Sequence, residues 1–273
     1  MRCTQKEIRE KLGITRDTLR FYEQKGIIQP EVDPANGYRY YDDWQVNLLW
    51  DCKFYQSMGF SLTEIQQILA SDELSTIQQR IQHRADKVEH ELERKKMELE
   101  LMRQHVEDME HAPHELGRVK LSHFDGCAYV PVRENHGFRQ DVDPGAVSFM
   151  NANMALMQPL SWFPRHDRDH YYWGYAMAPA MFETLTGSEK LKDDREDGNC
   201  PEGFTIIDAG QALETWLDAG DRWNFGLDLF DDLVADAHAR GLELRGEICG
   251  ILVARAHSEQ GYHRYLHVFL PVE

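Results

Sequence analysis

Apolar residues in the first 70 positions recur at helical spacing between polar capping signals. Residues 4–7 have the capping-box pattern Thr-x-x-Glu, and two apolar residues four apart follow before a glycine stop. A second short helix is predicted within residues 15–26, from an N-cap threonine to the next glycine. Arg16 and Arg20 share one face of that second helix. Two short helices with a tight turn and arginines on the second are typical of a major-groove reader.

A hairpin signal follows this two-helix unit. The Asn-Gly pair at residues 36–37 predicts a type I′ turn, because both central residues of that turn need positive φ. In the strand beyond it, alternation puts Arg39 on the face opposite Tyr38 and Tyr40. Arg39 can then reach a phosphate while one pair of tyrosines packs inward.

Two more helices are predicted before the pattern changes. Asp42 caps a helix from about Asp43 to Ser57, and Gly59 breaks it. Residues 61–64 form a second capping box, which opens a helix to about Ala70.

A seven-residue apolar repeat occupies the next 40 positions. Between Asp72 and Ala112 the chain has no Gly or Pro, and only Lys95 interrupts the repeat before Pro113 ends it. The repeat predicts a long coiled-coil helix that joins two copies in a symmetric dimer. A single helix packed on its own domain is the alternative. The repeat positions are Ile81, Val88, Met102 and Met109 in one series, and Ala85, Leu92, Leu99 and Val106 in the other.

Beyond Pro113, short strand-like runs alternate with helical stretches, which predicts an α+β domain. Its two halves are loosely repetitive, each with a strand, a helix and a strand pair. Residues 158–169 and 189–202 are predicted as loops, and helices are predicted near 146–157 and 225–240. The predicted strands are Cys127 to Val132, Tyr171 to Met177, Phe204 to Asp208, Ile248 to Ala254 and Tyr265 to Val272.

The net charge of −17 is unusual for a protein that binds nucleic acid, but the acid is unevenly distributed. Residues 1–44 hold eight Lys and Arg against eight Asp and Glu, whereas residues 121–273 hold twelve against twenty-five. DNA affinity must therefore come from the local placement of basic side chains and from dimerisation.

Several other classes of protein find little support. No apolar run approaches the ~18 residues of a membrane span, so we expect a cytoplasmic protein with no membrane contact. The five cysteines lack CxxC spacing, which argues against a disulfide framework and a thiolate metal site. His166 and His170 lack a nearby cysteine, and we predict neither a metal nor a cofactor. No Ser-His-Asp ordering, Walker loop or dinucleotide fingerprint is evident.

The first 70 or so residues resemble the MerR family of transcription regulators. Residues 16–23, Arg-Asp-Thr-Leu-Arg-Phe-Tyr-Glu, are similar to the family's R-x-L-R-[FY]-Y-E core. Residues 36–41 match its wing, N-G-[YF]-R-x-Y, and residues 58–65 resemble its G-F-S-L-x-E-I segment. Asp17, on the second helix, departs from the family's core motif, and an acid at this position would change the preference for bases.

The resemblance implies a homodimer on double-stranded promoter DNA. Effector binding would let the dimer untwist and bend this DNA, so that RNA polymerase engages both promoter elements. The resemblance implies major-groove contacts from Arg16, Thr18 and Arg20. It implies phosphate contacts from Tyr22, Tyr38, Arg39 and Lys53.

The second half of the C-terminal region resembles GyrI-like small-molecule-binding domains, at residues 203–210 and 265–272. The implied architecture is an all-α winged helix-turn-helix N-terminal domain (1–71), a long coiled-coil dimerisation helix (72–112) and an α+β C-terminal effector-binding domain (113–273). The resemblance places the chain among regulators of the multidrug-sensor type.

Aromatic residues are dense around the predicted strands of this domain, although ordinary core packing also accounts for each of them. Aromatic faces with a carboxylate inside would hold a bulky lipophilic cation. Glu247 is the preferred carboxylate because it begins an apolar strand, and Glu183 is the reserve. The predicted aromatic residues of the effector site are Tyr171, Trp173, Tyr175, Trp216, Trp223, Tyr262 and Tyr265.

Three other functions stay open beside a non-enzymatic regulator. A GyrI-like hydrolase would use Glu247 as a general base. A metal or redox sensor would need Cys127 or Cys200 to react with metal or oxidant. The acidic C-terminal domain would otherwise have a structural or partner-binding role.

Overall fold

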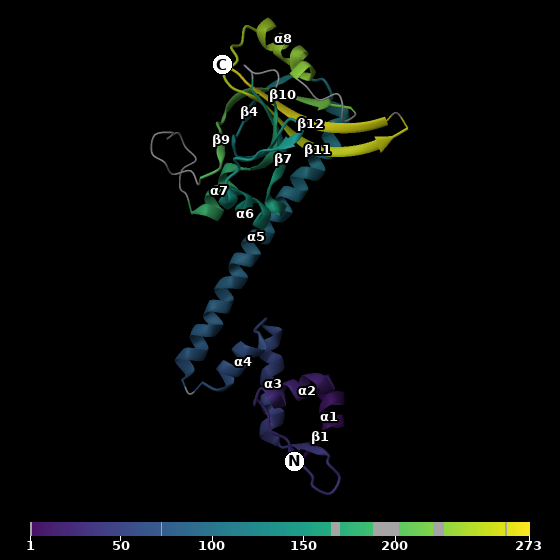
Figure 1. The fold of residues 1–273 in the computed structure, drawn as a ribbon, viewed down its shortest axis with the longest axis vertical. Helices are drawn as coiled ribbons and strands as arrows, with labels where there is room; N and C mark the ends of the chain where they lie inside the picture. Colours follow the sequence, from purple (N-terminus) through teal and green to yellow (C-terminus); the bar gives the residue numbers. More distant parts are fainter. Residues whose placement is uncertain (1, 72, 165–169, 188–201, 221–226, 260) are drawn as a thin grey trace. The chain divides into compact units, whose positions relative to one another are not determined.

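The computed structural model describes the chain except for residues 1, 72, 165–169, 188–201, 221–226 and 260 (Figure 1). The chain divides into two compact units, Met1–Glu93 and Arg94–Glu273. The division falls inside one long helix, α5 (Leu74–Glu115), and not at its ends. No helix among the described residues is long and apolar enough to cross a membrane.

The first unit contains the four short helices predicted from the sequence. They are α1 (Gln5–Leu12), α2 (Arg16–Gln24), α3 (Asp43–Ser57) and α4 (Leu62–Leu69). A side-chain oxygen caps the start of each helix, which satisfies a backbone N–H that has no partner within the helix. The capping residues are Thr4, Thr15, Asp42 and Ser61.

A small antiparallel sheet accompanies these helices, so the predicted all-α description of this unit is incomplete. Its order is β1 (Cys3–Thr4), β3 (Arg39–Tyr41) and β2 (Glu31–Val32). The predicted type I′ turn is wrong, because only Gly37 of the Asn-Gly pair has positive φ. Asp33 Oδ1 accepts the Ala35 N–H at 2.8 Å, so a side-chain bond stabilises a longer loop between β2 and β3.

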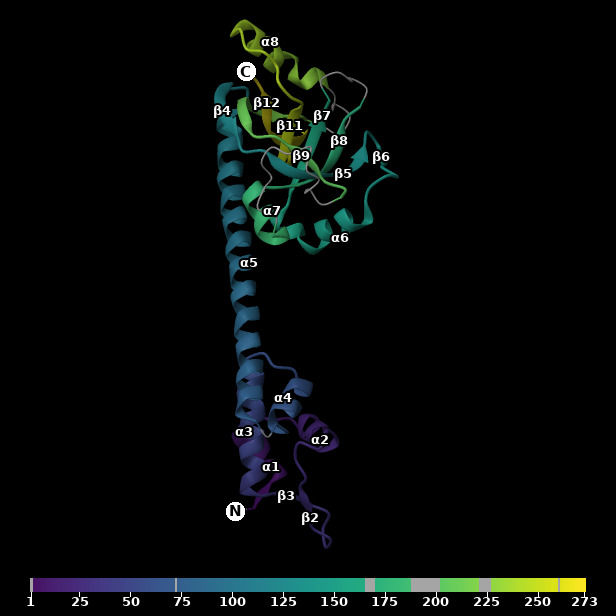
Figure 2. The same ribbon diagram turned by 90° about the vertical axis from the view of Figure 1, so that its left-hand side faces the viewer.

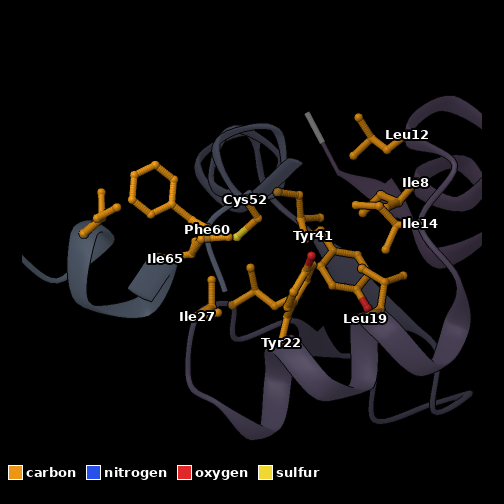
Figure 3. Packing of buried hydrophobic residues seen from close by; sticks show 13 residues of the cluster. Ile8, Leu12, Ile14, Leu19, Tyr22, Ile27, Tyr41, Cys52, Phe60 and Ile65 are labelled. Carbon is orange, nitrogen blue, oxygen red and sulfur yellow. The ribbon is translucent and has the colours of Figure 1, made fainter. Parts of the chain in front are cut away.

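The core of the first unit fixes the orientation of α2. Leu19 and Tyr22 of α2 are fully buried and pack with Tyr41 of β3 and with Cys52 of α3 (Figure 3). Ile65 adds a contribution from α4 to the same cluster. Burial of this face of α2 leaves its opposite face to solvent.

Helix α5 presents an apolar stripe to solvent. The helix is 42 residues long and contains Pro113, so the predicted end at Ala112 is wrong by about a turn. Gly117, with φ of 72°, follows the helix, which indicates that the glycine and not the proline ends it. Six residues of the predicted repeat are 42–59% exposed in the single chain: Val88, Leu92, Leu99, Met102, Val106 and Met109.

The second unit is built on a nine-stranded sheet in which all ladders between strands are antiparallel. The strand order is β4-β10-β12-β11-β7-β8-β5-β6, and β9 pairs with β5. The strands are β4 (Lys120–Phe124), β5 (Cys127–Glu134), β6 (Gly137–Phe138), β7 (Gln158–Phe163), β8 (Tyr172–Met177), β9 (Thr205–Ile207), β10 (Gly210–Asp218), β11 (Ile248–Ser258) and β12 (Gly261–Pro271).

The loose repeat predicted for this unit is present in the sheet. One half runs β5, α6 (Pro144–Ala152), β7 and β8, and the other runs β10, α8 (Asp231–Ala239), β11 and β12. The halves meet where β7 pairs with β11. Helices α6 and α7 (Pro179–Thr186) pack on β5, whereas α8 packs on the β10–β12 half (Figure 2).

Strand β7 lies at the centre of the sheet, in a segment that the sequence predicted as a loop. Pro159 suggested a loop because proline cannot donate to a ladder. The β7–β11 ladder ends at Leu160, so Pro159 lies beyond it and pairs only with Tyr175 of β8. Strands β4 and β10 and helix α7 were likewise not predicted, while β11 and β12 are longer than predicted.

Candidate DNA-binding surface and effector pocket

The solvent face of α2 carries two basic side chains. Thr15 caps the helix by accepting the Thr18 N–H at 3.1 Å, and the buried Leu19 and Tyr22 set its rotation. Arg16 and Arg20 are exposed, and neither has an ion-pair partner among the described residues. These guanidinium groups are therefore available to base edges and phosphates of a duplex.

Two of the predicted contacts on α2 are placed differently. The Thr18 hydroxyl is 2.8 Å from the Thr15 hydroxyl and the residue is half-buried, so it belongs partly to the helix cap. Tyr22 is fully buried, and its hydroxyl donates to Gln56 at 3.2 Å. The phosphate contact predicted for Tyr22 is wrong for this structure, because the side chain that matches the family motif is part of the core.

Glu23 of α2 ties the helix to β3. Arg39 Nε donates to Glu23 Oε2 at 3.0 Å, and the Tyr41 hydroxyl donates to Glu23 Oε1 at 2.9 Å. Burial raises the pKa of the Tyr41 phenol, and the hydrogen bond to Glu23 raises it further. Arg39 therefore lies on the same side of β3 as the buried Tyr41, and its ion pair with Glu23 uses Nε and not the terminal nitrogens. Tyr38 is 66% exposed.

Lys53 holds two helices of the first unit together. Its Nζ donates to the carbonyl oxygen of Leu12, the last residue of α1. A cation at the C-terminal end of a helix also interacts favourably with the helix dipole. Lys53 therefore has a structural contact, and its phosphate contact stays a prediction.

A cavity of about 480 Å³ opens on the sheet of the second unit. Four of the predicted effector-site aromatics line it together, from β8, the residue before β8, and the β11–β12 hairpin: Tyr171, Trp173, Tyr175 and Tyr262. Three arginines that we did not predict from the sequence line the same cavity: Arg133, Arg255 and Arg264. No Asp or Glu is among the described residues that line it.

The preferred carboxylate is in a different place from these aromatics. Glu247 lines a second cavity of about 380 Å³, which it shares with Arg245 and Asp208. Glu183 lies on α7 and does not line the 480 Å³ cavity. The prediction of one pocket that combines Glu247 or Glu183 with the aromatics is therefore wrong, because register across the sheet separates them.

The remaining predicted aromatics have other environments. Trp216 is buried, and its ring stacks on His267 with centroids 4.0 Å apart. Tyr265 packs against the same cluster. Trp216 is a core residue and Tyr265 is a half-buried residue packed on the same core, which agrees with the alternative of ordinary core packing. Trp223 lies outside the described residues.

The positions of two of these arginines in the β11–β12 hairpin could have been predicted from the sequence. Arg255 and Arg264 are directly opposite each other in the β11–β12 register, three residues from either side of the Ser258–Gly261 pair. Equal distance from a hairpin turn predicts such cross-strand neighbours. Arg133 joins them only through the pairing of β5 with β8, where it lies opposite Trp173.

Comparison with known proteins places the first unit in a family. The sequence profile described as "MerR HTH family regulatory protein" matches residues 3–72. The CueR transcriptional regulator of Escherichia coli O6:H1 is 31% identical over 124 residues, which cover 45% of this chain and 85% of that protein. The chain belongs to the MerR family.

Another relative in the MerR family matches a shorter part of this chain. The mercuric resistance operon regulatory protein of Bacillus cereus is 36% identical over 63 residues, which are 23% of this chain. This chain spans about half of that relative, 48% of its length. The solved EcmrR–DNA complex aligns over 99% of both chains at 16% identity, with a TM-score of 0.35, too low to support a conclusion.

The described cysteines of this MerR-family chain give little support to a metal or redox sensor. Burial raises the pKa of the Cys127 thiol to about 12, so the reactive thiolate is scarce at neutral pH. Cys200 and His166 lie outside the described residues. Among the residues that are described, no group of three His, Cys, Asp or Glu side chains is placed to hold a metal ion.

A Ser-His-Asp arrangement that we did not predict from the sequence is present in the second unit. His263 Nδ1 is 2.6 Å from Asp218 Oδ2, and His263 Nε2 is 2.7 Å from Ser258 Oγ. This is the hydrogen-bonding order of a serine hydrolase. Ser258 lines neither of the two cavities above, and the network joins the end of β10 to the β11–β12 hairpin, so we assign it a structural role.

The hydrogen bonds to the Asp218 carboxylate should make the free energy of unfolding depend on pH. Burial alone would raise the pKa of the Asp218 carboxyl, but bonds from His263 and from the N–H groups of Gly220 and Arg264 lower it. Asp218→Asn should therefore lower the free energy of unfolding by about 1–3 kcal/mol at neutral pH. Because the folded pKa is below the unfolded one, this contribution is present above pH ~4 and is lost as pH falls through the folded value.

Urea unfolding at neutral pH and near pH 3 measures this difference. Parent and Asp218→Asn should differ at neutral pH and converge in acid. Asp125→Asn is the control, because Asp125 is largely exposed and its partner is a surface histidine. A gap between parent and Asp218→Asn that stays the same in acid would contradict the assignment.

Proposed function

We propose that this MerR-family chain is a DNA-binding transcription regulator. The observation that carries the proposal is the solvent face of α2, where Arg16 and Arg20 have no ion-pair partners among the described residues and the buried face is fixed by Leu19. Two guanidinium groups on the second helix of a helix-turn-helix unit suit base and phosphate contacts in the major groove. Tyr38 and the terminal nitrogens of Arg39 add phosphate contacts from the β2–β3 hairpin, the proposed wing.

We infer that the regulator is a homodimer through residues 72–112. The exposed apolar stripe of α5 supports this inference, because six large apolar side chains exposed along one helix are unfavourable in water. The seven-residue spacing suits packing against a second helix of the same kind, as a coiled coil. A dimer would also present two copies of α2 to the two half-sites of an inverted repeat.

The output of such a dimer would be distortion of promoter DNA. A ligand that binds one conformation of the dimer more tightly shifts the population toward it. If that conformation untwists and bends the promoter, RNA polymerase engages both promoter elements. The C-terminal unit, which we propose to be GyrI-like, would supply the ligand site at the 480 Å³ cavity, a volume typical of small-molecule pockets.

Selection from a random duplex library with the purified full-length chain tests the proposed function. We expect enrichment of an inverted repeat, because a symmetric dimer reads two equal half-sites. The position of this repeat between the two elements of a promoter would support the distortion mechanism. Failure to enrich any duplex sequence would contradict a sequence-specific regulator.

A further inference from the structure

We propose that the 480 Å³ cavity binds a ligand that joins a flat aromatic body to an anionic group such as a carboxylate, sulfonate or phosphate. The inference rests on the proposed role of the C-terminal unit as the ligand-binding part, and it assigns the chemical class of the ligand. It replaces the lipophilic cation expected from the sequence, because the carboxylates chosen for that cation lie outside this cavity.

Two of the arginines at the cavity carry charges without a carboxylate partner. Among the described residues, neither Arg133 nor Arg255 makes an ion pair. Arg133 Nη2 donates only to the backbone oxygen of His136, at 3.3 Å. The neighbouring acid, Glu134, is directed to His170, which lies 3.5 Å away. The described residues that line the cavity therefore carry a net positive charge, in a unit that is acidic as a whole.

Backbone hydrogen bonds hold the third arginine, Arg264, in position. Arg264 is 6% exposed, and its guanidinium donates to the backbone oxygens of Gly220 at 3.1 Å and Ala219 at 3.4 Å. Burial raises the pKa of the Tyr171 phenol, and the charges of Arg133 and Arg264 oppose that rise. Both guanidinium groups thus lie within electrostatic reach of the same aromatic ring.

The aromatic residues supply a wall for the body of the ligand. Trp173 and Tyr175 are two residues apart on β8, so they face the same side of the sheet. Tyr262 faces the cavity from β12, on the same strand as Arg264. Aromatic faces bind planar rings by stacking, and the neighbouring guanidinium forks match the two oxygens of an anionic group.

Electrostatics decide between an anion and a cation at this site. A cation would gain from the aromatic faces but would meet positive charges on two sides of the cavity. An anion gains bidentate hydrogen bonds, which are stronger when both partners are charged. Because neither Arg255 nor Arg133 has a carboxylate partner among the described residues, an anion need not break an ion pair there to bind.

Three ligands of matched shape test the charge preference in the full-length chain: naphthoate, naphthamide and naphthylmethylammonium. Their binding is followed by tryptophan emission and calorimetry without DNA, so the result is independent of the DNA-binding proposal. We expect naphthoate to bind roughly tenfold or more tightly than naphthamide, and the ammonium compound to bind most weakly. Arg255→Gln should weaken naphthoate roughly tenfold while changing naphthamide less than about twofold.

Arg118→Gln is the matched control, because Arg118 is an exposed arginine of the same unit that pairs with Glu115 outside the cavity. It should leave all three affinities unchanged. Arg133→Gln provides a second variant with the same expected loss as Arg255→Gln. Preference for the ammonium compound, equal losses of naphthoate and naphthamide in the variants, or no binding of any of the three would overturn the proposal.

Discussion

The double substitution Leu92→Asp with Leu99→Asp should convert the protein from dimers into monomers. Both side chains belong to the exposed apolar stripe of α5, at 53% and 47% exposure in the single chain. In a helix pair these positions would be buried, and an unpaired carboxylate there costs several kcal/mol at each site. Each substitution occurs twice in a symmetric dimer, so the summed cost should exceed the free energy of association of the helix pair.

Sedimentation velocity at micromolar concentration measures this change directly. Arg103→Asp is the control, because Arg103 is exposed on the same helix but lies outside the seven-residue stripe. It should remain dimeric, while the double variant should also lose tight binding to a duplex with two half-sites. A double variant that still sediments as a dimer would place the interface elsewhere.

Removing both arginines of α2 should have the second large effect. Arg16→Ala with Arg20→Ala should weaken operator binding roughly a hundredfold or more, because each good base or phosphate contact contributes ~1–3 kcal/mol and a dimer repeats it. Each lost phosphate contact should also flatten the dependence on salt, by close to one unit of the log–log slope. Stability should change little, because both side chains are exposed and neither belongs to the core.

Fluorescence anisotropy with a labelled duplex at several salt concentrations gives both quantities. Lys87→Ala serves as control, because Lys87 is a surface cation on α5. We expect the control to bind as the parent does. Parent-like affinity and salt slope in the double arginine variant would show that α2 does not contact the duplex.

Local signals were sufficient to predict the first unit. The caps at Thr4, Thr15, Asp42 and Ser61 all form, because a side chain that bonds to an N–H three residues away needs only its own neighbourhood. The same reasoning failed at Asn36, where Asp33 supplies competing side-chain bonds within the loop. Tyr22 was misassigned because a motif does not say which face of its helix is buried.

The cavity depends on pairings that the sequence does not reveal. Arg133 reaches the aromatic wall only because β5 pairs with β8, and these strands are separated by α6 and β7. The central position of β7 was hidden by Pro159, whose missing donor lies beyond the end of the ladder to β11. Tyr171, Trp173 and Tyr175 are close in sequence, whereas Tyr262 joins them only through the strand order of the sheet, and the same order keeps Glu247 in a different cavity.

The ratio of two affinities measures whether the protein binds DNA sequence-specifically. The affinity of the full-length chain for its selected duplex is compared with its affinity for a scrambled duplex of equal length and composition, at near-physiological salt. We expect the selected duplex to bind at least ~10³-fold more tightly, as specific protein–DNA complexes do. Equal affinity for the two duplexes would contradict it, because phosphate contacts alone do not distinguish one sequence from another.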